Sequence, residues 1–416
     1  MRVRSVTTAV VEANFDWTIV RVEAVDGTVG WGEAFFAPGL VEMVDALAAL
    51  VVGEDARDVT RIVDRLYTAA SGAGSSGGVV LNAISGIDAA LWDLAARALD
   101  APLWRLLGGR FHDSVRVYAD CHGGSALTSL GPLLQIRRPA WLANAAGTVG
   151  RTLFEPGAET EEVDLDRVAA HAAEAVALGY DALKFDVDVP GLVPTTRGSR
   201  HLPAPAVALL PEIIAAIRRG AGPGVEFALD CHWRYDLPTA RLIARACEGV
   251  PLMWLEDPLA PDNVGGLRHL ARATSTPLGT GENLGRWAAF APLIEEHAVS
   301  VVTPDLAKVG GLAEARLVAA TAAARGIAVA PHNIAGPVGT AFAAQAAATM
   351  PNLLALEHHG LSVPFFDELI GGTPLIVRGR IAMTDAPGIG VDVDTDAVAR
   401  YARPGSRVFG RAVARG

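Results

Sequence analysis

The amino-acid sequence predicts an α/β protein in which a (β/α)₈ barrel of the TIM type follows a smaller α+β unit. The chain has 416 residues, more than one hydrophobic core usually holds. Its second half alternates short apolar runs with segments of helical periodicity, as parallel α/β folds do. Six of these runs end in a polar side chain, at intervals of 26, 26, 23, 27 and 25 residues, about what one strand, one helix and two loops need: Asp230, Glu256, Glu282, Asp305, His332 and Glu357.

Residues 1–112 are expected to form the smaller α+β unit. The first 30 residues carry alternating apolar patterns joined by the turn sequence VDGTVG, which indicates a β-hairpin. From about residue 41 the apolar residues recur at helical spacing. The pair Gly108 and Gly109 marks the end of the last helix. We therefore expect a few strands followed by helices.

The barrel is expected over residues 113–385, because strand and helix patterns begin to alternate at VRVYADCH. The eight strands are expected near 115–121, 181–186, 225–231, 252–256, 276–281, 299–304, 327–331 and 353–357. Helices are expected after most of them, near 162–179, 205–219, 237–248, 263–273, 285–297, 311–325 and 336–349. The last residues, 386–416, are expected to fold back onto the N-terminal unit.

Two connections after strands exceed the roughly 2–6 residues that are usual for a βα loop. They span 123–161 and 187–204, and the second contains Arg197 and Arg200. Loops that follow barrel strands lie at the face where active sites form, so we expect lids or specificity elements. Insertions without a role are the alternative.

The composition excludes several classes of partner. The net charge is −11 and basic runs are absent, which argues against a nucleic acid or an anionic membrane as partner. An apolar run of the roughly 18–20 residues that a membrane span needs is also absent. The N-terminus reads as a strand and not as a signal peptide, and the three cysteines are too scattered for a disulfide framework. We expect a cytoplasmic protein with reduced thiols.

Lysine is nearly absent from the chain. Among 35 basic residues the lysines are Lys184 and Lys308, both at the ends of expected strands. Where lysine and arginine are interchangeable this chain uses arginine, so the two lysines indicate positions that need a compact ammonium group. Chance retention is the alternative.

Three carboxylates close three consecutive strands and predict a metal site. The carboxyl ends of barrel strands meet at one face, so Asp230, Glu256 and Glu282 should lie close together, where they would repel each other without a cation. Ligation by oxygen alone suits Mg²⁺. A pair of these carboxylates could instead serve a glycosidase, and any one of them could cap a helix.

Two histidines are candidates for acid and base. Asp305 and His332 close adjacent strands, and a carboxylate behind an imidazole fixes its tautomer, so His332 is the candidate base. His232 lies two residues after Asp230 and should face the same side of the strand, as an acid beside the metal. Histidines satisfied in the core or at the surface are the alternative.

Further polar residues are expected around this site. Lys184 should face inward with Asp186 as its ion-pair partner, since the two are separated by one residue on a strand. Glu357 could hydrogen-bond an enolate oxygen if it is protonated. His358 and His359 follow it and are expected to be exposed at the rim.

Taken as a set, these segments resemble a known family. The pattern DCH, LEDP, GEN, PDLAKVGG, PHN and LEHH is similar to that of the enolase superfamily, mandelate racemase subgroup. The N-terminal strands, the helix LWDLAARALDAPLWRLLGGR and the tail PGIGVDVD extend the resemblance over almost the entire chain. It implies a modified TIM barrel with an N-terminal capping domain that the C-terminal tail completes, and often a homo-oligomer.

The resemblance also implies roles for individual residues. Mg²⁺ would be bound by the three strand-end carboxylates Asp230, Glu256 and Glu282. His332, paired with Asp305, would abstract a proton α to a carboxylate, because the metal neutralises the charge as it develops. Glu357 would stabilise the enediolate.

Departures from related patterns narrow the expected activity. Lys184-Phe185-Asp186 stands where the racemase pattern has K-x-K, and Asp305 stands where the muconate cycloisomerase pattern has a lysine. The D-x-H motif is similar to galactonate dehydratase and related acid-sugar dehydratases, in which the histidine, here His232, protonates the departing β-hydroxyl.

We therefore predict a Mg²⁺-dependent dehydratase of an aldonate or aldarate that forms a 2-keto-3-deoxy sugar acid. Lys184 would assist the substrate carboxylate, and the expected substrate-binding residues are His122, Arg197 and Arg200. One alternative is a racemase, epimerase or cycloisomerase that uses Lys184 and His332 on opposite faces. Another is a non-catalytic protein that binds acid sugars.

Overall fold

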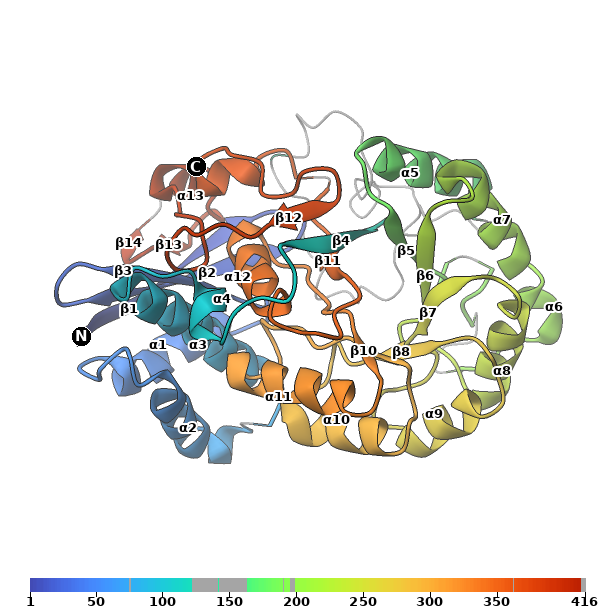
Figure 1. The fold of residues 1–416 in the computed structure, drawn as a ribbon, viewed down its shortest axis with the longest axis horizontal. Coiled ribbons are helices and arrows are strands. Elements are labelled where there is room, and N and C mark those ends of the chain that lie inside the picture. The colour runs from blue at the N-terminus through green and yellow to red at the C-terminus, as the bar shows by residue number, and fades with distance from the viewer. Residues whose placement is uncertain are drawn as a thin grey trace.

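The computed structural model describes residues 1–74, 76–121, 141, 163–189, 191–194, 199–361 and 363–412. Most of the 123–161 connection therefore lies outside the described residues, as do the candidate substrate-binding residues His122 and Arg197. Within the described part, the chain forms two β-sheets, a smaller antiparallel one and a curled parallel one surrounded by helices (Figure 1).

The smaller sheet has the strand order β14-β13-β1-β2-β3. Consecutive strands β1, β2 and β3 pair antiparallel, and the turn between β2 and β3 uses Gly27 with φ of 90°, which glycine adopts without strain. The C-terminal strands join this sheet through the pairing of Ala9 with Val408. The strands are β1 (Val3–Glu12), β2 (Asp16–Ala24), β3 (Val29–Ala34), β13 (Arg407–Val408) and β14 (Arg411–Ala412).

Helices cover one face of this sheet, and the longest, α3, lies against β3. A side chain at Gly30 or Gly32 would overlap the backbone of α3, so these glycines allow the close approach. By length and composition α3 could cross a membrane, but 89% of its most apolar window is buried, as in a core helix. The helices are α1 (Leu40–Val51), α2 (Val59–Ala69), the 3₁₀ turn Ser71–Ala73, α3 (Gly78–Ala98) and α4 (Leu103–Leu106).

The parallel sheet has the order β10-β9-β8-β7-β6-β5-β4-β11, and a parallel bridge between Val329 and Leu353 joins its two ends into a barrel. The buried ring of Trp254 belongs to a separate hydrophobic cluster formed by residues of the barrel strands. The predicted fold class is confirmed. The strands are β4 (Ser114–Asp120), β5 (Ala182–Asp186), β6 (Glu226–Asp230), β7 (Leu252–Glu256), β8 (Leu278–Thr280), β9 (Val301–Val302), β10 (Ala328–Val329) and β11 (Leu356–His358).

Helices pack around the outside of this barrel (Figure 1). One helix expected over 205–219 is divided into α6 and α7, because Pro211 occupies the first turn of α7 and starts a new helix there. The helices are α5 (Leu165–Ala177), α6 (Ala204–Val207), α7 (Leu210–Ala221), α8 (Leu237–Ala246), α9 (Val264–Ala271), α10 (Arg286–Glu295), α11 (Leu312–Ala323) and α12 (Pro337–Ala347).

The chain after the barrel contacts both units. Strand β12 (Arg380–Ala382) pairs antiparallel with β4 of the barrel. The 3₁₀ turn Asp367–Ile370 contacts helix α13 (Thr395–Arg400), and α13 lies beside β1 of the smaller sheet. The boundaries at residues 112 and 385 remain a prediction.

Candidate active site

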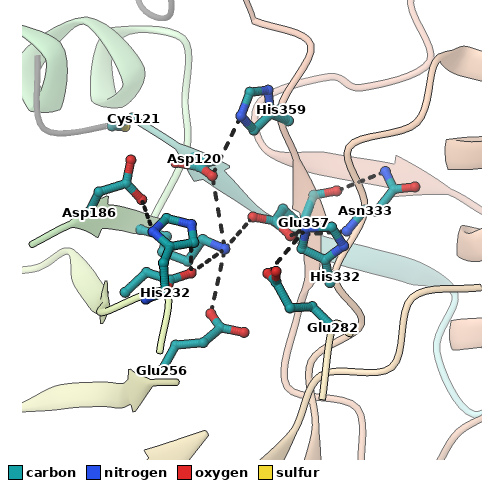
Figure 2. A network of polar contacts seen from close by, with 12 residues as sticks. Asp120, Cys121, Asp186, His232, Glu256, Glu282, His332, Asn333, Glu357 and His359 are labelled. Atoms are coloured by element: carbon teal, nitrogen blue, oxygen red, sulfur yellow. Dashed lines mark hydrogen bonds and ion pairs between the residues drawn. The ribbon is translucent and has the colours of Figure 1, made fainter. Parts of the chain in front are cut away.

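Three carboxylates meet at the carboxyl end of the barrel. Asp230 and Glu256 end the neighbouring strands β6 and β7 and are paired in the sheet register. Glu282 follows β8 after Gly281, whose φ of 145° is a conformation that favours glycine. One oxygen of each carboxylate lies within 4.8 Å of the others. Figure 2 shows Glu256 and Glu282 directed toward the middle of the polar network.

This group of carboxylates fits a divalent metal ion. All three side chains are buried, and Oε1 of Glu256 has no hydrogen-bond partner among the residues that the structure describes. Burial, together with the charges of Asp230 and Glu282, raises the pKa of Glu256 to about 7. A hard cation with oxygen ligands would satisfy the open oxygen and offset the repulsion.

Lys184 extends from β5 into the same group of carboxylates. Its Nζ lies 2.6 Å from Oε1 of Glu357, 3.2 Å from Oδ2 of Asp230 and 3.5 Å from Oε2 of Glu256. Burial alone would lower the pKa of Lys184, but Glu256 and Glu357 raise it well above its usual value. The expected ion pair with Asp186 is wrong, because the long side chain carries the ammonium to the centre of the barrel.

His332 and Asp305 lie within hydrogen-bond distance, as expected from their positions after β10 and β9. Nδ1 of His332 is 2.7 Å from Oδ2 of Asp305, and Nε2 is 3.4 Å from Oε2 of Glu282 and 3.7 Å from Oε2 of Glu357. Burial would lower the pKa of His332, but Glu282, Glu357 and Asp305 raise it to about 9. One ring nitrogen therefore faces Asp305 and the other faces the carboxylates.

His232 lies on the opposite side of the network from His332 (Figure 2). Its Nδ1 is 3.0 Å from Oδ1 of Asp188 and 3.8 Å from Oδ1 of Asp186, and its Nε2 is 3.7 Å from Oδ2 of Asp230. Burial would lower the pKa of His232, but Asp230, Asp188 and Asp186 raise it well above the usual value.

The route by which His232 reaches the site differs from the expectation. Strand β6 ends at Asp230, and His232 has a positive φ of 44°. Its N–H donates to Oδ1 of Asp230 over 2.9 Å, so His232 enters from a turn and not from a continuing strand. Asp188 was not identified as a site residue from the sequence. Its spacing of two from Asp186, at the end of a buried strand, could have indicated that both side chains face the site.

The charged groups around Glu357 favour its carboxylate form, whereas the expected hydrogen bond to an enolate oxygen requires the protonated form. Burial would raise its pKa, but Lys184 and His332 lower it below its usual value. Its Oε2 accepts a hydrogen bond from the backbone N–H of Asn333 over 3.0 Å. Glu357 thus joins the ammonium to the segment that carries the candidate base.

His358 and His359 are buried and not exposed at the rim. The expectation failed because the N-terminal unit covers the end of β11: Nδ2 of Asn14 lies 2.9 Å from Nδ1 of His359 and donates to its carbonyl oxygen over 2.8 Å. Nε2 of His359 is 3.8 Å from Oδ2 of Asp120, at the end of β4. Asn14 and Asp120 are further polar residues at the site that the sequence did not reveal.

Among the candidate substrate-binding residues, Arg200 is described. It is exposed, and its guanidinium donates to the carbonyl oxygen of Trp233 over 3.2 Å, beside His232. His122 and Arg197 lie outside the described residues.

Comparison with known families agrees with this architecture. Residues 3–108 match the mandelate racemase / muconate lactonizing enzyme N-terminal domain, and residues 167–397 match the enolase C-terminal domain-like family. The fold and the strand-end site thus define a protein of the enolase superfamily. Within it, the chain belongs to the mandelate racemase / muconate lactonizing enzyme family.

Individual relatives cover nearly the whole chain. A D-xylonate dehydratase of Haloferax volcanii is 34% identical over 98% of this chain and 90% of its own length. A D-galactonate dehydratase of Xanthomonas oryzae pv. oryzae is 28% identical over 92% and 90%. Among solved structures, a mandelate racemase/muconate lactonizing enzyme-like protein of Rubrobacter xylanophilus superimposes with a TM-score of 0.86 and 36% identity, covering 98% and 99%. A putative L-alanine-DL-glutamate epimerase of Burkholderia xenovorans gives 0.81 and 27%, covering 96% and 98%.

Proposed function

We propose that this protein is a Mg²⁺-dependent acid-sugar dehydratase, a hydro-lyase that converts an aldonate or aldarate into a 2-keto-3-deoxy sugar acid. The observation that carries the proposal is the pair of imidazoles on either side of one carboxylate group. His332 has Asp305 behind it at 2.7 Å, and His232 has Asp188 behind it at 3.0 Å. The relatives named xylonate and galactonate dehydratases support the substrate class.

Asp230, Glu256 and Glu282 would hold the metal ion. A divalent cation there would supply positive charge for the substrate carboxylate and for the charge that develops on it when C2 loses its proton. Lys184 adds a positive charge on the same side, since its Nζ lies 3.2 Å from Asp230. The two charges together favour an anionic substrate despite the net charge of −11 on the chain.

His332 takes the C2 proton through Nε2, the nitrogen that faces the centre of the site. Asp305 then holds the Nδ1–H and stabilises the imidazolium that results. Oε2 of Glu357 lies 3.7 Å from Nε2 of His332, and Oε1 lies 2.6 Å from Nζ of Lys184, so Glu357 would hold the ammonium at the side of the site where the enediolate forms.

His232 completes the elimination. As the electron pair left at C2 forms the double bond, the C3–O bond breaks and the proton of His232 goes to the departing hydroxyl, which leaves as water. The resulting enol tautomerises to the 2-keto acid. Asp188 keeps the ring oriented, because it accepts from Nδ1 and directs Nε2 toward the metal side.

A screen of acid sugars tests the proposal. The protein is incubated with Mg²⁺ and a panel of mono- and diacid sugars, D-xylonate and D-galactonate first, and 2-keto acid formation is measured. Formation of a 2-keto-3-deoxy acid from at least one member supports the proposal. Binding of panel members without product would favour the non-catalytic alternative.

An epimerase is the second candidate, favoured by the similarity to the putative L-alanine-DL-glutamate epimerase of Burkholderia xenovorans. It would need Lys184 as the base on the second face. Nζ of Lys184 lies 2.6 Å from Oε1 of Glu357, so the ammonium would have to give up this ion pair to act as a base. Deuterium at C2 of recovered substrate with inverted configuration and no 2-keto acid would favour this candidate.

A homo-oligomer and a cytoplasmic location remain predictions.

A further inference from the structure

The two helices that follow the Asp305–His332 pair begin without a capping side chain of their own. Helix α11 has Gly311 at its N-cap and α12 has Gly336, and in the described structure neither residue offers a side-chain acceptor. The first turn of a helix has N–H groups that lack partners within the helix. Both of these helix ends are buried, so other acceptors are needed.

The N-terminal unit supplies these acceptors. Oδ2 of Asp88, on α3, accepts from the N–H of Leu312 over 2.7 Å. The two oxygens of Glu33, on β3, accept from the N–H of Gly336 over 2.6 Å and from the N–H of Gly339 over 2.9 Å. Carboxylates are favourable at these positions because the N-terminus of a helix carries partial positive charge.

The glycines make room for these contacts. A Cβ at Gly311, whose φ is 115°, would lie 2.7 Å from Cγ of Asp88. A Cβ at Gly336 would lie 2.7 Å from the ring of Trp17 and 3.2 Å from Oε1 of Glu33. The small residues on the barrel and the carboxylates on the N-terminal unit therefore form matched contacts.

A hydrogen bond joins the N-terminal turn of α12 to the residue next to the candidate base. Thr340 lies in its first turn, next to Gly339, and its Oγ1 accepts from Nδ2 of Asn333 over 2.9 Å. Asn333 directly follows His332, and its N–H donates to Glu357. A shift of the helix end would therefore move Asn333, and with it the imidazole.

We propose that Glu33 is a positioning residue for the base. By holding the N-terminus of α12, it fixes His332 in the geometry needed to remove the C2 proton. This inference rests on the proposed function, since it takes His332 as the base. It makes the N-terminal unit part of the proton-transfer machinery and not only a cover over the barrel.

The test compares Glu33→Gln with a matched carboxylate-to-amide change. Asp164→Asn is the control. Asp164 caps the barrel helix α5 by accepting from two N–H groups, and α5 does not follow either of the strands that precede Asp305 and His332. A glutamine can accept with one side-chain oxygen only, so one of the two N–H groups loses its acceptor. Rates are measured well below the unfolding temperature of each variant, with the acid sugar identified in the screen, D-xylonate first.

We expect Glu33→Gln to lower kcat and the rate of C2 hydrogen exchange together by roughly tenfold or more, since small displacements of reacting groups cost that much. KM should not change, and neither should the affinity for Mn²⁺, which is measured in the absence of substrate. Asp164→Asn should match the wild type in all of these quantities. If Glu33→Gln lowers only the unfolding temperature and leaves kcat and exchange unchanged, its role is structural and the inference is overturned.

Thr340→Val decides the matter if Glu33→Gln does not fold. It removes the hydroxyl that accepts from Asn333 and keeps the shape of the side chain. The same joint loss of kcat and exchange supports the inference, and wild-type values overturn it. His332→Asn, measured in parallel, distinguishes failure of the proposed function from failure of this inference. If C2 hydrogen exchange persists in His332→Asn, both the proposed function and this inference are wrong. If exchange is lost in His332→Asn but Glu33→Gln or Thr340→Val retains wild-type rates, this inference alone is wrong.

Discussion

Nδ1 of His332 lies 2.7 Å from Oδ2 of Asp305, so the ring has one nitrogen committed to a carboxylate and one facing the strand-end carboxylates. Asp305 is itself fixed, because its other oxygen accepts from the N–H of Ala307 over 2.7 Å. This relationship gives the imidazole a defined direction before any substrate arrives, which is the requirement for a general base.

Replacing His332 by asparagine should therefore abolish chemistry without disturbing the metal. We expect 2-keto acid formation and C2 hydrogen exchange to fall by at least about 100-fold, the usual contribution of a general base. Mn²⁺ affinity, measured by calorimetry, should stay near the wild-type value. Normal turnover in this variant would contradict the role of His332.

Replacing His232 by asparagine should separate the two proton transfers. His332 remains able to remove the C2 proton, so exchange of deuterium from D₂O into the recovered substrate should persist. Expulsion of the 3-hydroxyl should slow by roughly 100-fold or more, because the leaving group lacks its acid. NMR of the substrate and an assay of the 2-keto acid measure both. Equal loss of both rates would assign His232 to the first step and not to the second.

Lys184→Met should destabilise the metal-free protein more than the metal-bound one. The ammonium is buried among Asp230, Glu256 and Glu357, and removing one partner of a buried charge group costs about 3–5 kcal/mol. Mg²⁺ would offset part of this loss, since it neutralises Asp230 and Glu256. Denaturant unfolding with and without Mg²⁺ measures the difference. An unfolding free energy that Mg²⁺ raises equally in variant and wild type would count against this arrangement.

The pH dependence of stability should reveal Glu33. Burial raises the pKa of Glu33 from its ordinary 4.5 to about 7, although two backbone N–H groups oppose the shift. A carboxyl with a raised pKa in the folded state stabilises it fully below the ordinary value, and this contribution is lost as the pH rises through the folded value. The unfolding free energy of the wild type, relative to Glu33→Gln, should therefore fall between about pH 4 and pH 7.

Denaturant unfolding of both proteins across this pH range provides the measurement. The comparison with the variant cancels the other titrating groups, which the two proteins share. A difference between them that stays constant with pH, or that grows toward neutral pH, would contradict the raised pKa of Glu33.

The barrel and the strand-end residues could be predicted from the sequence because parallel strands of a barrel end at one face. Regular spacing therefore placed Asp230, Glu256 and Glu282 together, and placed Asp305 beside His332. The same rule could not give the partner of Lys184, since the reach of a long side chain across the barrel does not follow from strand alternation.

Contacts between the two units were beyond the reach of sequence patterns. Asn14 covers His359, and Glu33 caps α12, over separations of more than 300 positions in the chain. Neither periodicity nor turn chemistry records such pairings. His358 and His359 were consequently expected at the surface, because the residues that bury them belong to a distant segment. The break between α6 and α7, in contrast, was readable from Pro211.

Hydrogen exchange at C2 under control of the metal tests the central claim most directly. The protein is exhaustively chelated, incubated with the acid sugar in D₂O, and then supplied with Mg²⁺, beside Glu256→Gln treated in the same way. We expect exchange and 2-keto acid formation to disappear on chelation and to return with Mg²⁺ in the wild type but not in the variant. Full exchange after chelation, or full recovery in Glu256→Gln, would contradict the account.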